Sequence, residues 1–355
     1  MFYREAGQYA SSYAQDRQLL PLRQDKLGML IMMALGLVAI PLWASDYWIS
    51  AIMIPWLVLA LVALGQNILM GYAGQLSLGS AGFMAAGAFA CYNLILRVPG
   101  IPFVAAVILS GLIAAVIGIL FGLPSLRIRG LYLAVATLAS QFFIVWGLDK
   151  FGWFKNYDTS GIINAQAIVI FGYTMGSPVQ KYLVVFVIVG VMALLAANMA
   201  QGSVGRGWMA VRDMDVAAEA MGLSLLRTKL TAFAISSFYC GVGGALFLFA
   251  YLQTVEPATF NIELSFRILF MVIIGGLGTI LGPFLGSAFI LLLPIFLNIM
   301  FHAILGHAVD ATITSALEQV IFGVLIIVFL IFEPLGLARL WQVTKERLRL
   351  WPFKY

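Results

Sequence analysis

The chain has 355 residues, of which 63% are hydrophobic and only 10% are charged, with a mean hydropathy of +1.02 and a net charge of +5. Soluble domains carry about 25% charged residues, so this composition leaves too little polar surface for a water-soluble globule. It excludes a soluble enzyme, a disordered protein and a nucleic-acid-binding domain, and it indicates a protein solvated by lipid. Cys91 and Cys240 lie in apolar runs and are interpreted as small hydrophobic residues.

Uncharged runs long enough to cross a bilayer follow one another along the chain. Two of these runs, Asp46–Arg97 and Ile268–Val309, are too long for one crossing and are expected to hold two each. We therefore predict an all-α integral membrane protein with about ten transmembrane helices. The expected spans are Leu27–Ser45, two within Asp46–Arg97, Val98–Leu126, Leu131–Leu148, Tyr182–Ala200, Leu230–Val255, two within Ile268–Val309 divided at Gly282-Pro283, and Ala316–Phe332.

Basic residues gather on one side of the expected spans. Loops rich in Lys and Arg stay in the cytoplasm, so both termini and the loop between the sixth and seventh spans are placed there. The clusters are Arg4, Arg17, Arg23 and Lys26; Arg127 and Arg129; Arg206, Arg212, Arg227 and Lys229; and Arg339, Lys345, Arg347, Arg349 and Lys354.

The chain is then expected to divide into three parts. Residues 1–26 form a cytoplasmic N-terminal tail or a segment lying in the membrane interface. Residues 27–335 form the transmembrane domain, whose sixth and seventh spans are joined by a cytoplasmic loop at 203–229. Residues 336–355 form a basic cytoplasmic tail.

Residues that could carry out chemistry are scarce. No Gly-Lys pair occurs, so the sequence lacks the phosphate-binding loop of an ATPase. His302 and His307 stand apart from other ligand types, and neither a metal site nor a catalytic site is expected. Acidic residues lie near span ends, which argues against a proton relay. Glu263 and Arg267, four residues apart, are expected to form an intrahelical ion pair.

Two glycine-rich stretches stand out, GYAGQLSLGSAG at 71–82 and GGLGTILGPFLGS at 275–287. Close helix packing alone accounts for Gly82, Gly87 and Gly286. Polar side chains beside flexible backbone predict, in addition, one broken helix in each half of the chain, lining a transport pathway. The candidate pathway residues are Gly74, Gln75, Ser77, Gly79 and Ser80 in the first stretch, and Gly275, Gly276, Gly278 and Thr279 in the second.

The loop at 203–229 contains a predicted short helix. Asp213 and Asp215 suit its first turn, where acidic side chains complement the helix dipole, and Gly222 suits a left-handed C-terminal cap. The residues expected to share its apolar face are Met214, Ala217, Ala218 and Met221. Such a face suits insertion into a groove on a partner protein, and an interfacial helix resting on lipid headgroups is the alternative.

Three motifs, GYAGQLSLGSAGF, GRGWMAVRDMDVAAEAMG and GGLGTILGPFLGSAF in this order, resemble those of the permeases of branched-chain amino acid ABC importers, specifically the longer M-type subunit. The resemblance covers residues 27–335. It implies that the short helix is a coupling helix that contacts an ATPase. The implied contact residues are Arg212, Asp213, Asp215, Ala217, Ala218, Glu219, Ala220, Met221 and Gly222. Importer permeases generally have Glu-Ala-Ala with a glycine further on, whereas this chain has Met221 followed directly by Gly222.

The same resemblance implies a heterodimer with a shorter H-type permease, two ATP-binding subunits that hold ATP and Mg²⁺, and a periplasmic solute-binding protein. The assembly would lie in the inner membrane of a bacterium, surrounded by lipid. This chain is expected to bind no cofactor and no nucleic acid, and to catalyse no reaction. It would form the pathway for branched-chain amino acids or a related small polar solute. Two alternatives stay open: a permease of the same family for urea, amides or aromatic carboxylates, and a self-sufficient secondary transporter or channel.

Charged residues are too scarce in the expected spans to hold a second permease by ion pairs. We therefore expect an apolar subunit contact in which small residues let helices approach. The candidates for this contact are Gly87, Ala88, Gly118 and Gly122.

Overall fold

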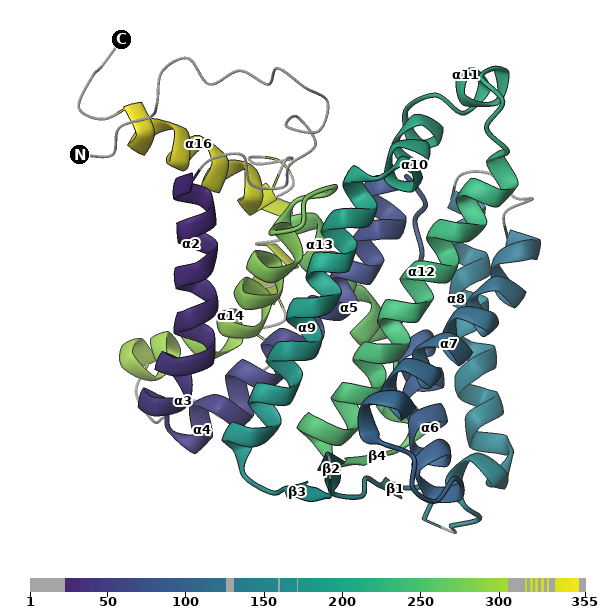
Figure 1. Ribbon diagram of the computed structural model, residues 1–355, viewed down its shortest axis with the longest axis vertical. Coiled ribbons are helices and arrows are strands. Elements are labelled where there is room, and N and C mark those ends of the chain that lie inside the picture. Colours follow the sequence, from purple (N-terminus) through teal and green to yellow (C-terminus); the bar gives the residue numbers. More distant parts are fainter. Residues whose placement is uncertain are drawn as a thin grey trace.

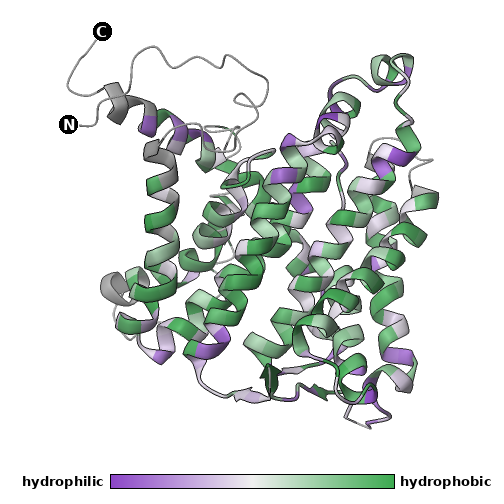
Figure 2. Ribbon diagram, viewed as in Figure 1, coloured by the Kyte–Doolittle hydropathy of each residue, from purple (hydrophilic) through white to green (hydrophobic). Residues whose placement is uncertain are grey.

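The computed structural model describes residues 23–125, 131–158, 160–170, 172–305, scattered residues between 317 and 331, and 336–350. In this part the chain is a bundle of long helices (Figure 1). Their residues are predominantly hydrophobic over most of the bundle height (Figure 2).

The α-helices are α2 (Arg23–Ala34), α3 (Ile40–Trp43), α4 (Asp46–Trp48), α5 (Ile54–Asn67), α6 (Ser80–Arg97), α7 (Phe103–Ser125), α8 (Leu131–Lys150), α9 (Pro178–Gln201), α10 (Ser203–Asp213), α11 (Asp215–Ala220), α12 (Leu225–Leu246), α13 (Ile262–Gly275), α14 (Gly282–Leu305) and α16 (Gly336–Leu350). The π-helical stretches are η1 (Leu35–Ala39), η2 (Ile49–Met53), η3 (Ile68–Tyr72) and η5 (Phe247–Leu252). Two short 3₁₀ helices are η4 (Gly152–Lys155) and η6 (Pro257–Thr259).

The bundle has two distinct ends (Figure 1). Helices α10, α11 and α16 and the start of α2 lie at one end, which we call the α11 end. The opposite end carries four short strands and is called the strand end. The strands are β1 (Ile163–Asn164), β2 (Ile168–Ile170), β3 (Tyr173–Met175) and β4 (Thr254–Val255).

Seven of the described helical segments are long and apolar enough to cross a membrane. They are Asp46–Tyr72, Phe103–Leu123, Leu133–Lys150, Pro178–Gln201, Leu225–Leu252, Pro257–Gly275 and Gly282–Met300. The run α2–η1–α3 and helix α6 cover the expected first and third spans. The tenth expected span lies largely outside the described residues, as do residues 1–22 of the expected N-terminal tail. The expectation of a mostly helical protein with many apolar spans is confirmed.

Helices α5 and α12 form the centre of the bundle. In the spans that contain them, 72% and 83% of the residues are buried, against 33% to 44% in the other five. Helix α12 packs against α5, α6 and α7, and glycines let the backbones meet. A Cβ atom at Gly244 would overlap the carbonyl oxygen of Met84 in α6, and one at Gly87 would overlap the backbone of Gly241 in α12.

The prediction that Gly87, Ala88, Gly118 and Gly122 contact a second permease is wrong. Gly118 lies against Ser237 of α12, the glycine at 122 lies against Phe233, and Ala88 is fully buried. These small residues line contacts between α12 and its neighbours α6 and α7 in the same chain, because α12 lies at the centre of the bundle. The cysteines, in contrast, are free and buried as expected.

The strand end is more structured than the polar loop expected there. Strand β1 pairs antiparallel with β4, with Ile163 opposite Val255, and β2 pairs antiparallel with β3. The Arg97 guanidinium lies 3.7 Å above the Trp153 ring, and its Nη2 atom donates to the Trp153 carbonyl. Short paired segments of this kind carry no periodic signal long enough to be recognised in a sequence.

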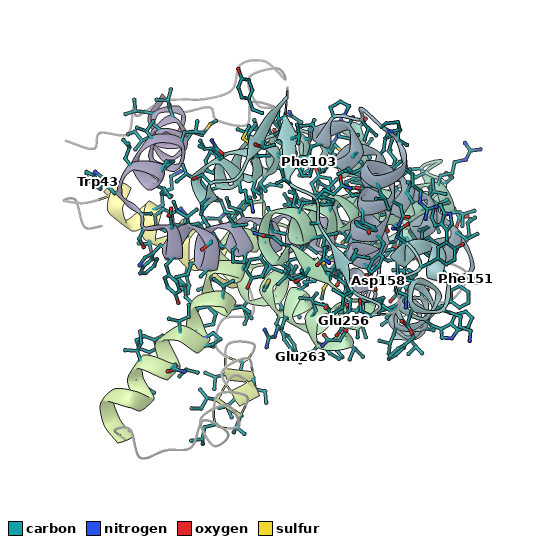
Figure 3. All side chains as sticks on the ribbon, turned by 90° about the horizontal axis from the view of Figure 1, so that it is seen from below. Trp43, Phe103, Phe151, Asp158, Glu256 and Glu263 are labelled. Atoms are coloured by element: carbon teal, nitrogen blue, oxygen red, sulfur yellow. The ribbon has the colours of Figure 1, made fainter. Side chains whose placement is uncertain are left out.

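Charged groups at the strand end are mostly paired locally. The expected ion pair between Glu263 and Arg267 is confirmed, at 2.8 Å. Hydrogen bonds from the backbone and side chain of Ser160 lower the pKa of the Asp158 carboxyl. Figure 3 views the bundle from this end, with Asp158, Glu256 and Glu263 on one side and Trp43 on the other.

The residues expected to form a basic tail contain a helix, α16, which packs against α13 and α14. It begins at Gly336, whose φ is +74°. A Cβ atom at this glycine would lie 2.6 Å from the backbone of Gly276. Ala338 is buried and Leu337 packs on the core, so one apolar side of the segment holds it against the bundle.

Candidate functional site

The loop expected to contain one short helix contains two, and we call them together the α10–α11 segment. Trp208 of α10 is 1% exposed, and its indole nitrogen donates to Thr231 Oγ1 of α12 at 3.2 Å. Helix α10 lies upstream of the start predicted for the short helix, and it packs on the bundle through the buried side chains of Trp208 and Val211. Asp213 therefore ends α10, and Asp215 begins α11 after an extended residue, Met214.

Helix α11 presents an exposed surface that differs from the predicted face. Ala218 is fully buried and packs inward, so it does not share an outer face with the two methionines. The exposed residues are Met214, Val216, Ala217, Glu219, Ala220, Met221 and Gly222. Gly222 has a φ of +89° and its N–H donates to the Glu219 carbonyl at 2.9 Å, which confirms the left-handed cap.

The glycine-rich stretches connect consecutive helices and do not interrupt a single helix. We call residues 73–79, between η3 and α6, the first glycine turn, and residues 276–281, between α13 and α14, the second glycine turn. Positive φ angles at Gly74 (+68°), Gly276 (+117°) and Gly278 (+72°) turn the chain at these points. Such angles terminate a helix, which is why each predicted break has become a boundary between helices.

The first glycine turn is tied to its neighbours by buried polar contacts. Gln66 Nε2 donates to the Ser77 carbonyl at 2.6 Å, and the Leu78 N–H donates to Thr137 Oγ1 of α8 at 2.9 Å. Position 79 requires glycine, because a Cβ there would lie only 2.7 Å from the Thr137 carbonyl oxygen. At the start of α6, the Ser80 hydroxyl contacts Ser265, which donates to Gln141 Oε1.

Gln75 differs from its polar neighbours. Its side chain is 4% exposed, yet neither Oε1 nor Nε2 has a hydrogen-bond partner within the described part of the chain. Buried polar atoms are normally satisfied, and an unpaired one costs about 1–3 kcal/mol. We therefore expect the unpaired amide to destabilise this arrangement of the first glycine turn.

The second glycine turn is held by its own hydroxyl. Thr279 Oγ1 donates to the Gly276 carbonyl at 2.9 Å and accepts from the Gly282 N–H at 3.1 Å. A Cβ at Gly275 would overlap the Gly282 carbonyl oxygen. The expected pathway residues of the second stretch thus form a tight, self-bonded turn.

Asn67, the last residue of α5, joins that helix to the second glycine turn. Its Nδ2 atom donates to the Thr279 carbonyl at 2.7 Å, and its Oδ1 atom accepts from the Gly278 N–H at 2.9 Å. Gly71 of η3 lies so close that a Cβ would overlap the Gly278 nitrogen. Asn67 was not predicted as a site residue, although an amide side chain within an uncharged apolar span is a signal of a polar contact.

Arg212 brings the α10–α11 segment onto the same junction. Its Nη1 atom donates to the Gly71 carbonyl at 2.7 Å, and its Cγ would lie 2.7 Å from a Cβ at Gly74. Its Nε atom donates to Asp213 Oδ1 at 2.8 Å, which lowers the pKa of that carboxyl. The structure thus gathers Arg212, Gly74 and Gly278, and leaves the outer residues of α11 apart from them.

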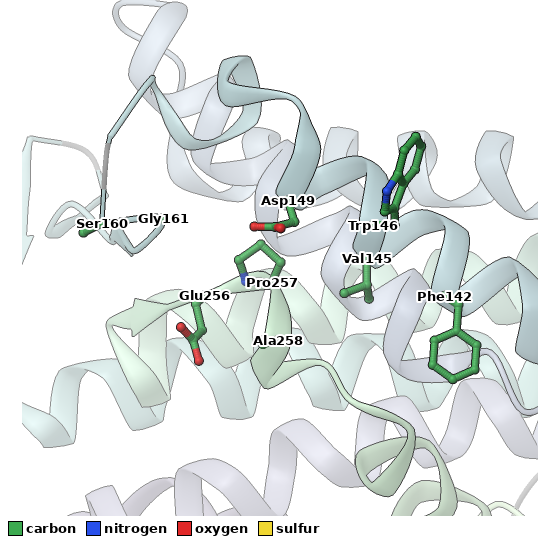
Figure 4. A pocket seen from close by; sticks show the side chains of 9 residues that line it. All are labelled: Phe142, Val145, Trp146, Asp149, Ser160, Gly161, Glu256, Pro257 and Ala258. Carbon is green, nitrogen blue, oxygen red and sulfur yellow. The ribbon is translucent and has the colours of Figure 1, made fainter.

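Two hollows are found away from this junction. One, of about 370 Å³, lies at the strand end (Figure 4). Its lining residues are Phe142, Val145, Trp146, Asp149, Ser160, Gly161, Glu256, Pro257 and Ala258. The Asp149 carboxylate accepts from Lys155 Nζ at 2.8 Å. The other hollow borders Trp43 and Trp48. Neither is lined by a residue of the glycine turns.

A bundle with this many apolar spans, glycine turns at one end and an exposed helical segment beside them defines a multi-pass membrane protein. Residues 48–330 match the family described as the branched-chain amino acid transport system permease component. The chain belongs to this family of transport permeases.

Three curated proteins illustrate the relationship. The chain is 27% identical over 317 residues to the high-affinity branched-chain amino acid transport system permease proteins LivM of Salmonella typhimurium and of Escherichia coli, covering 82% of this chain and 69% of each relative. It is 24% identical over 237 residues to a probable LivM permease of Methanocaldococcus jannaschii, covering 65% of this chain and 67% of that relative. No solved structure shows significant similarity to the chain.

Proposed function

We propose that this chain is one permease subunit of an ABC importer in the inner membrane of a bacterium and carries branched-chain amino acids. A shorter H-type permease completes the pathway. Two ATPase subunits bind ATP and Mg²⁺, and a periplasmic binding protein delivers the solute. In this arrangement the α11 end faces the cytoplasm, both termini lie there, and ten helices cross the membrane.

The observation that carries the proposal is the α10–α11 segment. It is anchored by the buried Trp208 and exposes Met214, Val216 and Met221 at more than two-thirds of their surface. Exposed large apolar residues on a short helix indicate a protein contact. The basic clusters support a cytoplasmic position for this end, where an ATPase is available. Few fixed charges line the glycine turns, which suits a zwitterionic solute.

The proposal is tested by uptake into vesicles that contain the complex purified from cells expressing the whole operon. We expect labelled leucine to accumulate only with ATP inside the compartment that faces the ATPases, and only with the binding protein present. Uptake that persists without the ATPases would establish a secondary transporter or channel instead. Uptake of labelled urea or an aromatic carboxylate, but not of leucine, would show that the permease carries another class of substrate.

Charge reversal on α11 is expected to uncouple the complex. Glu219→Lys places a cation on the exposed helix, and Gly222→Pro removes the N–H that bonds Glu219 and is incompatible with a φ of +89°. In both variants we expect the chain to reach the membrane and solute-stimulated ATP hydrolysis to fall at least about tenfold, since losing 1.4 kcal/mol of coupling has that effect.

Gln342→Lys is the matched control for this prediction. It adds a cation at the same end, on the exposed side of α16 and outside the α10–α11 segment. The complex that contains this variant is expected to hydrolyse ATP at the normal rate. Normal stimulation in both α11 variants would show that α11 is not the ATPase contact.

The pathway assignment is tested with single cysteines at Gln75, Ser77 and Thr279. Gln75 and Ser77 are 4% and 2% exposed, so cysteines there should be unreactive in the described state. We expect them to react with a polar maleimide when ATP and solute drive the transport cycle, on a background with Cys91→Ala and Cys240→Ala. If transport continues while the cysteines at Ser77 and Thr279 stay unlabelled in every state, the glycine turns only pack the helices and do not line the pathway.

A further inference from the structure

A single side chain of the α10–α11 segment bonds η3 and lies close to both glycine turns. The Arg212 guanidinium bonds the Gly71 carbonyl at 2.7 Å, and its Nη1 atom would lie 3.6 Å from a Cβ at Gly278. Gly74 leaves the space that the Arg212 stem occupies, since a Cβ there would lie 2.7 Å from Cγ. The arginine is therefore fitted into the junction and does not merely lie over it.

The rest of the segment is fastened to a different helix. Trp208 is buried against the bundle and donates to Thr231 of α12. Gly71, in contrast, belongs to η3, which continues α5, and Gly278 follows α13. Arg212 thus connects a segment that packs on α12 to residues that continue α5 and lie beside the turn following α13.

Asn67, the last residue of α5, bonds the second glycine turn through both of its side-chain hydrogen bonds. Beside this contact, Arg212 adds a charge-assisted hydrogen bond to Gly71 of η3, and bonds of this kind are stronger than neutral ones. Asp213 accepts from the guanidinium Nε at 2.8 Å, while Nη1 donates to the Gly71 carbonyl. Movement of α10 away from η3 would break the Nη1 bond.

We propose that Arg212 is a positioning residue that latches the α10–α11 segment to η3 and the first glycine turn at the α11 end, and releases them when an ATPase moves that segment. The inference rests on the proposed function, because it requires a partner that displaces this segment. In the described structure the latch is closed. Opening it frees the first glycine turn, with Gln75, from its contact with Arg212.

Whether the latch is open or closed is measured by the reactivity of a cysteine introduced as Ala73→Cys. Ala73 is 4% exposed and lies beside the junction. The complex is purified in detergent without nucleotide, with Cys91→Ala and Cys240→Ala, and is labelled with a polar maleimide. Arg212→Met should label about tenfold faster than the parent, because loss of a charge-assisted hydrogen bond shifts the closed state by at least that factor. Arg212→Lys, which keeps the charge but not the fork of donors, should lie between them.

Arg206→Met is the matched control. Arg206 lies in the same helix and donates only locally, to the Gln201 carbonyl at 3.0 Å, so labelling should equal that of the parent. A second readout separates a latch from a structural role: ATP should accelerate labelling of the parent and leave Arg212→Met unchanged. Equal rates in the parent and both Arg212 variants would overturn the proposal, as would an equal acceleration by Arg206→Met.

The two proposals fail in different ways. If no ATPase co-purifies and uptake is independent of ATP, the importer assignment fails. The labelling rates of the variants without nucleotide still report whether Arg212 holds the first glycine turn against the α10–α11 segment. If Arg212→Met does not accumulate, Arg212→Lys carries the same comparison, and a parental rate in that variant counts against the latch.

Discussion

Replacing Gly244 by valine is expected to prevent the chain from accumulating as folded protein. A Cβ at this position would overlap the Met84 carbonyl oxygen. The position of the Cβ is fixed by the α12 backbone and the oxygen belongs to the α6 backbone, so no side-chain rotation relieves the overlap. Overpacking of a core usually costs about 1–3 kcal/mol and more where the backbone must move. We expect about 3 kcal/mol or more here, a large share of the roughly 5–15 kcal/mol that stabilises a domain.

The same substitution at Gly190 is the control. Gly190 lies in α9, and a Cβ there would meet no atom within 4 Å. Gly190→Val should leave the yield and melting temperature of the detergent-purified protein unchanged or slightly raised, because glycine is a poor helix former. Similar yields for the two variants would contradict the close approach of α6 and α12.

Replacing Gln75 by methionine is expected to stabilise the protein and to abolish transport. The buried amide has no partner in the described part of the chain, so an apolar side chain of similar size removes a penalty of about 1–3 kcal/mol. An unsatisfied group of this kind is retained where it serves another state. We expect the melting temperature to rise and uptake by the complex to fall at least about tenfold.

Gln66 offers a control of opposite sign. It is 1% exposed, nine residues earlier in the chain, and its Nε2 atom donates to the Ser77 carbonyl at 2.6 Å. Gln66→Met leaves that carbonyl unpaired and should lower the melting temperature. If Gln75→Met lowers the melting temperature as Gln66→Met does, the amide of Gln75 is satisfied in the protein and the argument is wrong.

Signals confined to neighbouring residues predicted the structure well. Uncharged runs marked the spans because hydropathy is a local property. Gly222 was recognised as a left-handed cap because acidic and apolar residues before it define a helix end. The Glu263–Arg267 pair followed from spacing alone. Each of these needed no knowledge of the partner helix.

Features that depend on distant contacts were not predicted. Ala218 looked like part of an outward face, but packing of the segment turned it inward. Gly87 and Gly118 were assigned to a subunit contact because the sequence does not say that α12 fills the centre of the chain. Asn67 and Arg212 bond atoms 141 to 212 residues away, and such pairings are set by the fold.

The π-helical stretch η3 gives the first glycine turn a particular freedom. A π turn bonds each residue one position further along than an α turn. Exchanging one pattern for the other therefore advances the helix by a residue and rotates all that follows by about 100°. Asn67 immediately precedes η3 and Gly71 lies within it. Such a register shift would re-aim the Gly71 carbonyl relative to the Asn67 amide while the helix keeps its backbone hydrogen bonds, so the turn can swivel without a hinge in the loop.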